Sequence, residues 1–207
     1  PDDNIRKDTK LPLKKGVMME IRSFFGQHYS NYEVYDPNKN VIPLNGANVD
    51  TAILLGFDHI KFCIAPNNLI DNNGSLIVEN MTYITRNINM TIEKDIPVIL
   101  CMHPEGDFKN KYLGNLKNFE KLVKWYSELA AYIGEHWSPD EVALQIMTEP
   151  FGNNSTVRWD WQSDRQALAV RNVLPEYTIL TSSDQAGNLE KLKEMSPATD
   201  DNLIYTF

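Results

Sequence analysis

The chain has 207 residues, of which 42% are hydrophobic and 23% charged, a composition typical of a globular protein and not of a disordered one. Its formal net charge of -8, without a dense Lys/Arg patch, argues against a nucleic-acid partner or an anionic membrane surface. No apolar run approaches the roughly 20 residues needed to span a bilayer, and both cysteines, Cys63 and Cys101, lie in apolar runs typical of buried free thiols.

The first part of the chain predicts a strand, a helix and a second strand after a polar start. Residues 1–15 carry charges of both signs and are expected to form a loose lead-in to a single domain over residues 1–207. Residues 16–21 predict a strand, and the helix that follows can end at Gly56, because glycine readily adopts the left-handed conformation of a C-terminal cap. Residues 59–66 predict a strand that is almost continuously apolar, as strands covered on both faces are.

The same alternation continues to the last residue. The clearest pattern lies over residues 116–133, where apolar residues recur at steps of three and four and therefore share one helical face. The other predicted elements are helices over residues 49–55, 81–92, 158–174 and 189–195, and strands over residues 98–103, 142–151, 177–181 and 202–207. Strands and helices that alternate in this way form right-handed βαβ units around a parallel sheet.

Two α/β folds fit this alternation, a doubly wound open sheet and a (β/α)8 TIM barrel. No G-x-G-x-x-G or P-loop motif follows the first predicted strand, which favours the barrel. A complete barrel has eight strands and typically about 250 residues, whereas the sixth predicted strand here runs into Phe207. We therefore expect a TIM barrel that is incomplete in this chain, with about six βα units and a truncation within strand six.

A carboxylate closes the fourth predicted strand. The apolar run from Val142 leads to Glu149, and Pro150 should hold Glu149 in extended geometry at the end of the strand. Barrel enzymes keep their chemistry at this end of the strands, and polar clusters follow the other predicted strands here while the opposite ends are blander. A solvated carboxylate is the alternative, but the pattern favours Glu149 as a general acid/base.

Polar residues also follow the third predicted strand. His103 comes directly after an apolar run and could bind substrate or orient the site, or could be a histidine packed at the barrel rim. Together with Glu105 and Asp107 it has the chemistry of a metal site, yet no H-x-H or H-E-x-x-H spacing supports one. We therefore predict neither a metal nor a cofactor.

Two tryptophans follow the segment around Glu149. Trp159 and Trp161 could stack on the flat apolar faces of sugar rings. Because both lie at the start of a predicted helix, core packing is the alternative for at least one of them.

Four segments occur in the order expected of one enzyme family: residues 56–62, 98–103, 145–150 and 202–207. With them the chain from Gly16 onward resembles glycoside hydrolase family 5, the cellulase family of retaining (β/α)8 barrels in clan A. The resemblance implies that Glu149 is the acid/base glutamate and that His103 is the histidine after strand three. It also implies that Tyr205 lies in the strand that runs into the family's strand-six site residue.

The chain departs from the family pattern at three places. Thr148 stands where the family usually has the asparagine that binds the sugar 2-hydroxyl, and Lys61 stands where it usually has an arginine held against the nucleophile. The nucleophile itself, a glutamate ending strand seven, would lie beyond Phe207. Because a retaining glycosidase needs two carboxylates about 5 to 5.5 Å apart, we expect this chain alone to be inactive unless a C-terminal fragment completes the barrel.

The sequence therefore predicts a retaining glycoside hydrolase that cleaves β-1,4-linked plant polysaccharide, most simply an endo-glucanase. Residues expected to bind the substrate around Glu149 are His103, Thr148, Lys61, Trp159, Trp161 and Tyr205. The alternatives are a carbohydrate-binding pseudoenzyme and a mannanase or xylanase on the same fold. The resemblance also implies a secreted protein, although the chain itself shows no signal peptide.

Overall fold

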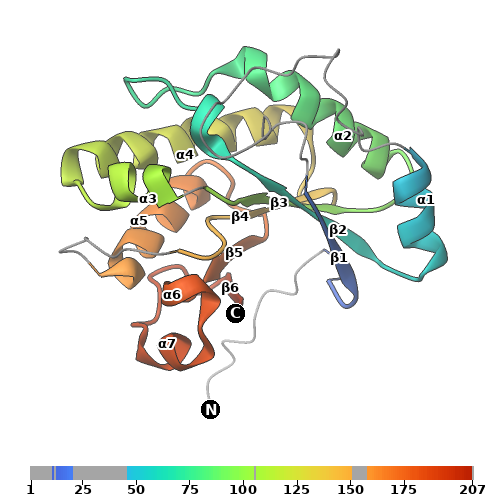
Figure 1. Cartoon of the computed structure of the whole chain (residues 1–207). Helices are drawn as coiled ribbons and strands as arrows, with labels where there is room; N and C mark the ends of the chain where they lie inside the picture. Colours follow the sequence, from blue (N-terminus) through green and yellow to red (C-terminus); the bar gives the residue numbers. More distant parts are fainter. Residues whose placement is uncertain (1–10, 12, 21–45, 105, 151–157, 207) are drawn as a thin grey trace.

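The computed structural model describes residues 11, 13–20, 46–104, 106–150 and 158–206, and in this part of the chain six parallel strands alternate with helices (Figure 1). The strands are β1 (Gly16–Glu20), β2 (His59–Ile64), β3 (Val98–Met102), β4 (Val142–Gln145), β5 (Ile179–Ser182) and β6 (Leu203–Thr206). They pair in sequence order, each parallel to the next.

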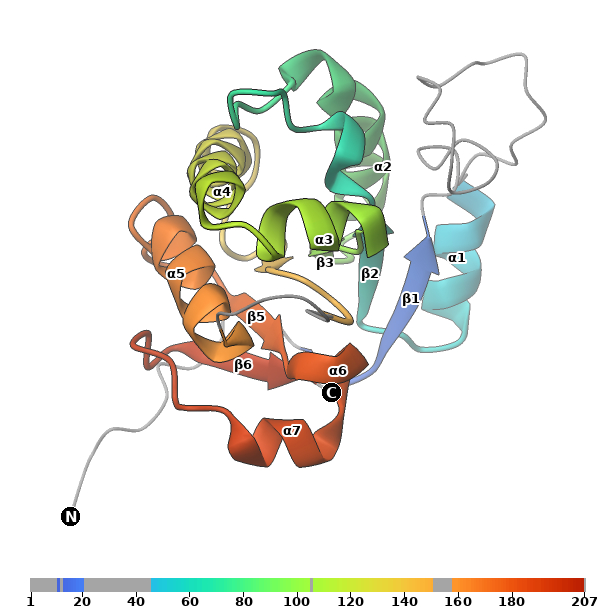
Figure 2. The same ribbon diagram turned by 60° about the vertical axis from the view of Figure 1, so that its left-hand side comes forward.

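Helices occupy the chain between the strands of this sheet. They are α1 (Gly46–Leu54), α2 (Thr82–Ile92), α3 (Gly106–Leu113), α4 (Leu116–His136), α5 (Trp159–Arg171), α6 (Asp184–Gly187) and α7 (Leu189–Glu194), with short 3-10 helices η2 (Pro66–Asn68) and η3 (Val78–Met81). Figure 2 shows the strands following a curve from β1 to β6, with α1, α2, α4 and α5 around its outside. None of the described helices is long and apolar enough to cross a membrane.

The predicted fold is confirmed, since a curved run of parallel strands with outer helices is the arrangement of an incomplete TIM barrel. The strand and helix predictions hold with shifts of a few residues at their ends, except that β4 ends at Gln145, well before the predicted end of the fourth strand at residue 151. Two short helices were not predicted, α3 after β3 and α6 after β5. The single-domain assignment remains a prediction, and Leu11, within the expected lead-in, is only 3% exposed.

The two faces of the sheet carry two separate apolar clusters because side chains alternate along a strand. The larger cluster joins the outer face to the helices, and α4 contributes a continuous buried stripe that includes Leu122, Trp125 and Tyr126. The smaller cluster lies on the inner face, where Leu11 packs with Ile99, Ala143, Leu180 and the partly buried Leu13 and Ile204.

On β4, β5 and β6 the inner face becomes polar two residues beyond the smaller cluster. Gln145 follows Ala143 on β4, and its Nε2 donates to Ser182 Oγ at 2.8 Å and to Thr206 Oγ1 at 3.2 Å. Cys101 pairs with Gln145 in register, and Gln145 is 1% exposed. An apolar layer followed by a polar one is how layered barrel interiors place chemistry at one end of the strands.

Candidate active site

Glu149 and His103 meet at the carboxyl edge of the sheet. Backbone hydrogen bonds extend the strand pairing past the ends of β3 and β4, since His103 N donates to Ile64 O and Thr148 N donates to Met102 O, both at 2.8 Å. His103 Nε2 then lies 3.5 Å from Glu149 Oε2, with the two side chains 28% and 56% exposed. The structure therefore brings together the two residues that the sequence placed after neighbouring strands, and leaves the carboxylate accessible to a ligand.

Glu149 does not have the predicted backbone conformation. Its φ is +48°, in the left-handed region, whereas a residue before proline was expected to be extended. β4 ends at Gln145, so Glu149 lies in the turn after the strand and not on its last residue. Such a conformation persists only where surrounding contacts hold it.

A buried pair of cysteines lies beside His103. Cys63 and Cys101 are opposite one another on β2 and β3. Both are free and buried, as predicted. The hydrogen bond from the Cys101 thiol lowers the pKa of Cys63 to about 5, while burial raises the pKa of Cys101 well above its usual range. The pKa of His103 is raised first by its hydrogen bond with Cys63; burial opposes this rise, and the charges of Cys63 and Glu149 add to it.

Lys109 on α3 is a site residue that the sequence interpretation missed. Its side chain is buried, with the residue 7% exposed, and its Nζ donates to the backbone carbonyl oxygen of Glu149 at 2.6 Å. Tyr112 and Leu113 lie three and four residues further along and are also buried. That spacing, read as one helical face, is the signal that could have identified α3 and the inward direction of Lys109.

Lys61 lies on the same inner face as Cys63, two residues earlier on β2 and therefore further from the carboxyl edge. It is half-buried, and its hydrogen bond and charge act on Cys101, so it contributes to the polar layer beneath His103. Thr148 is also half-buried, next to Glu149 in the turn after β4. Lys61 lies on the inner face of the sheet and Thr148 lies at its carboxyl edge, where the sequence placed them. Their contact with substrate remains a prediction.

Trp159 shows the core packing that the sequence offered as an alternative for at least one of the tryptophans, and stacking on a sugar ring remains a prediction for Trp161. Trp159 is 6% exposed, and its indole N–H donates to Ser182 O at 2.7 Å, so α5 uses it to hold the end of β5. Trp161 is 41% exposed, but its ring lies 5.3 Å from that of Phe119 on α4 and next to Arg165. Both positions follow from α5 packing against α4 and β5, and the sequence alone did not indicate which tryptophan would be buried.

Tyr205 lies in the sixth strand, as the resemblance implied, but on the outer face of the sheet. Its side chain packs with the outer cluster between sheet and helices, and its hydroxyl oxygen accepts a hydrogen bond from Ala198 N at 2.8 Å. The next residue, Thr206, faces inward and bonds to Gln145 and Ser182. Because neighbouring residues of a strand point to opposite faces, Thr206 and not Tyr205 belongs to the inner polar layer.

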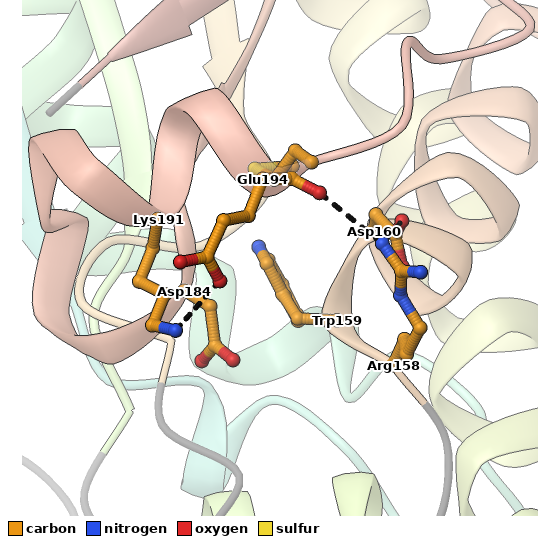
Figure 3. A pocket seen from close by; sticks show the side chains of 7 residues that line it. Arg158, Trp159, Asp160, Asp184, Lys191 and Glu194 are labelled. Atoms are coloured by element: carbon orange, nitrogen blue, oxygen red, sulfur yellow. Dashed lines mark hydrogen bonds and ion pairs between the residues drawn. The ribbon is translucent and has the colours of Figure 1, made fainter.

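A pocket of about 330 Å³ lies next to the carboxyl end of β5 (Figure 3). It is lined by Arg158, Trp159, Asp160, Asp184, Lys191, Glu194 and Met195. Most of its charges pair with one another, Arg158 with Asp160 at 2.7 Å and Lys191 with Glu194 at 2.6 Å. Asp184 is the remaining charged residue of the lining, and Glu149 is not among the residues that line this pocket.

The metal alternative gains no support from the described residues. No group of three or more His, Cys, Asp or Glu side chains among them could hold a metal ion. Asp107 lies in the first turn of α3, and Glu105 falls outside the described residues.

A curved parallel sheet with a carboxylate and an imidazole at its carboxyl edge defines the class of (β/α)-barrel proteins whose chemistry lies in the loops after the strands. The family follows from comparison of the sequence. Residues 38–207 match the model of the family "Cellulase (glycosyl hydrolase family 5)", and the chain belongs to this family.

Individual relatives agree with this assignment. Cellodextrinase A of Ruminococcus flavefaciens is 21% identical over 159 residues, which cover 73% of this chain and 47% of that protein. Cel5A of Thermotoga maritima, solved with mannotriose, superposes with a TM-score of 0.75 at 16% identity, over 95% of this chain and 60% of its own. The cellulose synthase subunit Z of Clostridioides difficile gives a TM-score of 0.71 at 14% identity, over 93% and 60%. The chain thus spans about half to three-fifths of the length of these relatives.

Proposed function

We propose that this chain is part of a retaining β-1,4-glycosidase of endo-glucanase type, with Glu149 as its general acid/base. Membership in glycosyl hydrolase family 5 supports a glycosidase. The observation that carries the assignment of Glu149 is its position at the carboxyl edge, 3.5 Å from His103 and more than half exposed. A carboxyl group there can reach a bound sugar and exchange a proton with it.

In the proposed mechanism Glu149 first gives its proton to the glycosidic oxygen while a second carboxylate attacks the anomeric carbon. Glu149 then takes a proton from the water that releases the glycosyl intermediate. The second carboxylate is proposed to be a glutamate on strand seven, so the proposed reaction would use more of the barrel than β1 to β6. His103 would orient Glu149, and Thr148 and Lys61 would lie around the reacting sugar.

The substrate is proposed to be a β-1,4-glucan such as cellulose or a mixed-linkage glucan. Thermotoga maritima Cel5A has been solved in complex with cellobiose and with mannotriose. A mannan is therefore the first alternative substrate to test. Secretion is part of the same proposal, because a polymer of this size must be degraded outside the cell.

The test is Glu149→Gln in a whole protein that contains this chain. We expect release of reducing sugar from carboxymethylcellulose or barley glucan to fall by about 100-fold to 10,000-fold, because glutamine cannot donate the proton. Glu141→Gln is the matched control, since Glu141 precedes β4 at the opposite end of the same strand. Activity of Glu149→Gln close to that of the unchanged enzyme would remove Glu149 from this role.

A carbohydrate-binding pseudoenzyme is the second candidate. Thr148 and Lys61 motivate it, because the family usually has Asn and Arg at these positions, where they hold the reacting centre. Isothermal calorimetry with cellotetraose separates the two candidates. Binding by the whole protein without any hydrolysis would favour the pseudoenzyme.

A further inference from the structure

The turn that carries Glu149 is held by contacts from three other segments. Thr148 N donates to Met102 O at 2.8 Å on one side of Glu149, and Ala186 N donates to Pro150 O at 3.1 Å on the other. The third contact is made at Glu149 itself, whose carbonyl oxygen accepts from Lys109 Nζ at 2.6 Å. These contacts coincide with the left-handed φ of +48° at Glu149.

The contact from Lys109 differs from the other two because a charged side chain makes it. Lys109 is 7% exposed, and burying an ammonium group is unfavourable unless a partner compensates it. A charged donor also forms a stronger hydrogen bond than a neutral one. Phe108, Tyr112 and Leu113 are buried on the same helix, so the ammonium group is presented to Glu149 from a packed face of α3.

From this geometry we propose that Lys109 is a positioning residue, which holds the backbone of Glu149 so that the carboxyl group faces the glycosidic oxygen. This inference rests on the proposed role of Glu149 as general acid/base. When the bond from C1 to the glycosidic oxygen breaks, the Glu149 proton moves to that oxygen and the leaving sugar departs as an alcohol. Lys109 keeps its own proton and touches neither the substrate nor the reacting atoms.

The test uses two substrates that differ in their need for this proton. Cellotetraose has a poor leaving group that must be protonated, whereas 2,4-dinitrophenyl β-cellobioside releases a phenolate that leaves unaided. Because kcat/KM reports the steps up to the first bond cleavage, it is the quantity to compare. A merely structural role for Lys109 would lower kcat/KM equally for both substrates.

For Lys109→Met in the whole protein we expect kcat/KM on cellotetraose to fall by about 10-fold to 100-fold, the size of effect that a small misplacement produces. On the dinitrophenyl substrate we expect kcat/KM of Lys109→Met to change by about twofold or less. Methionine keeps much of the volume of lysine and limits packing loss. Lys111→Met is the matched control, because Lys111 is an exposed residue of the same helix and should leave both values unchanged.

Glu149→Gln, measured in parallel, separates this proposal from the proposed function. If Glu149→Gln shows the selective loss on cellotetraose and Lys109→Met loses both activities equally or neither, the positioning role is overturned while Glu149 keeps its own. If Glu149→Gln hydrolyses cellotetraose normally, both proposals are overturned. If Lys109→Met does not fold, kcat/KM of Lys109→Gln is compared on the same two substrates. The glutamine side chain is uncharged and shorter than that of lysine, so it also removes the charged donor.

Discussion

Arg171, the last residue of α5, should be a major determinant of stability at the end of the sheet opposite the candidate active site. Its guanidinium group donates to Asp200 Oδ2 at 2.8 Å, and the two side chains are 15% and 5% exposed. It also donates to the carbonyl oxygens of Leu174, Pro175, Tyr177 and Asn202. These contacts join α5 to the segments that lead into β5 and β6.

The magnitude for Arg171→Met follows from what the substitution leaves behind. Removing one member of a buried ion pair costs about 3–5 kcal/mol, because the other charge stays buried and unpaired. In this variant Asp200 Oδ1 still accepts a hydrogen bond from Asn202 N, at 3.0 Å in the structure, so we take the lower end of this range of free energies. A loss of about 3 kcal/mol corresponds to a fall in Tm of about 6–12 °C for a domain of this size.

Urea unfolding of the 207-residue chain, followed by circular dichroism, measures this loss. Arg165→Met is the matched control, because Arg165 lies on α5 like Arg171. The side chains of its ion pair with Glu120 on α4 are 43% and 50% exposed, so the pair should contribute less than about 1 kcal/mol. In Arg171→Met/Asp200→Asn the unpaired charge is gone, so we expect this variant to be more stable than the sum of the two single changes predicts. Equal losses for Arg171→Met and Arg165→Met, or strict additivity in the double variant, would refute the reasoning.

Two further predictions concern the site. The pKa of His103 should exceed its ordinary value of 6.5 in an NMR titration and should fall in Cys63→Ala, because the hydrogen bond with Cys63 is the largest cause of the rise. Since the folded-state pKa is raised, the stability that His103 contributes is present below pH 6.5 and is lost as pH rises through the raised pKa. An unchanged titration midpoint of His103 in Cys63→Ala would contradict Cys63 as the cause of the rise. Trp159→Phe should lower the free energy of unfolding by about 1–3 kcal/mol, because the buried carbonyl of Ser182 loses its donor, whereas Trp161→Phe should change it by less than about 0.5 kcal/mol. Equal effects of the two tryptophan substitutions in urea unfolding would argue against the packing role of Trp159.

Local patterns were sufficient for the fold of this chain. Apolar steps of three and four along α4, and apolar runs bounded by residues such as Pro97 and Pro175, are set by neighbours a few positions away. Parallel pairing then follows from the alternation of strands with helices. The same logic brings Glu149 and His103 to one edge, because both lie in the segments that follow the carboxyl ends of neighbouring strands.

Side-chain direction near the strand ends was predicted less well. Tyr205 and Thr206 are adjacent on β6, so their side chains point to opposite faces of the sheet. An error of one residue in assigning the inner face exchanges the two. Trp159 and Trp161 were interpreted by residue type, but α5 packing directs one to β5 and the other to α4.

By itself the sequence determined the order of the strands, the family, and the placement of a carboxylate and an imidazole at one edge of the sheet. Only the tertiary structure decided the left-handed turn at Glu149 and the residue that holds it. Proline after Glu149 favours an extended backbone, and this local preference is overridden by contacts with β3, α3 and α6. Lys109 and Glu149 are 40 residues apart in the chain, and they meet because β3 and β4 pair side by side.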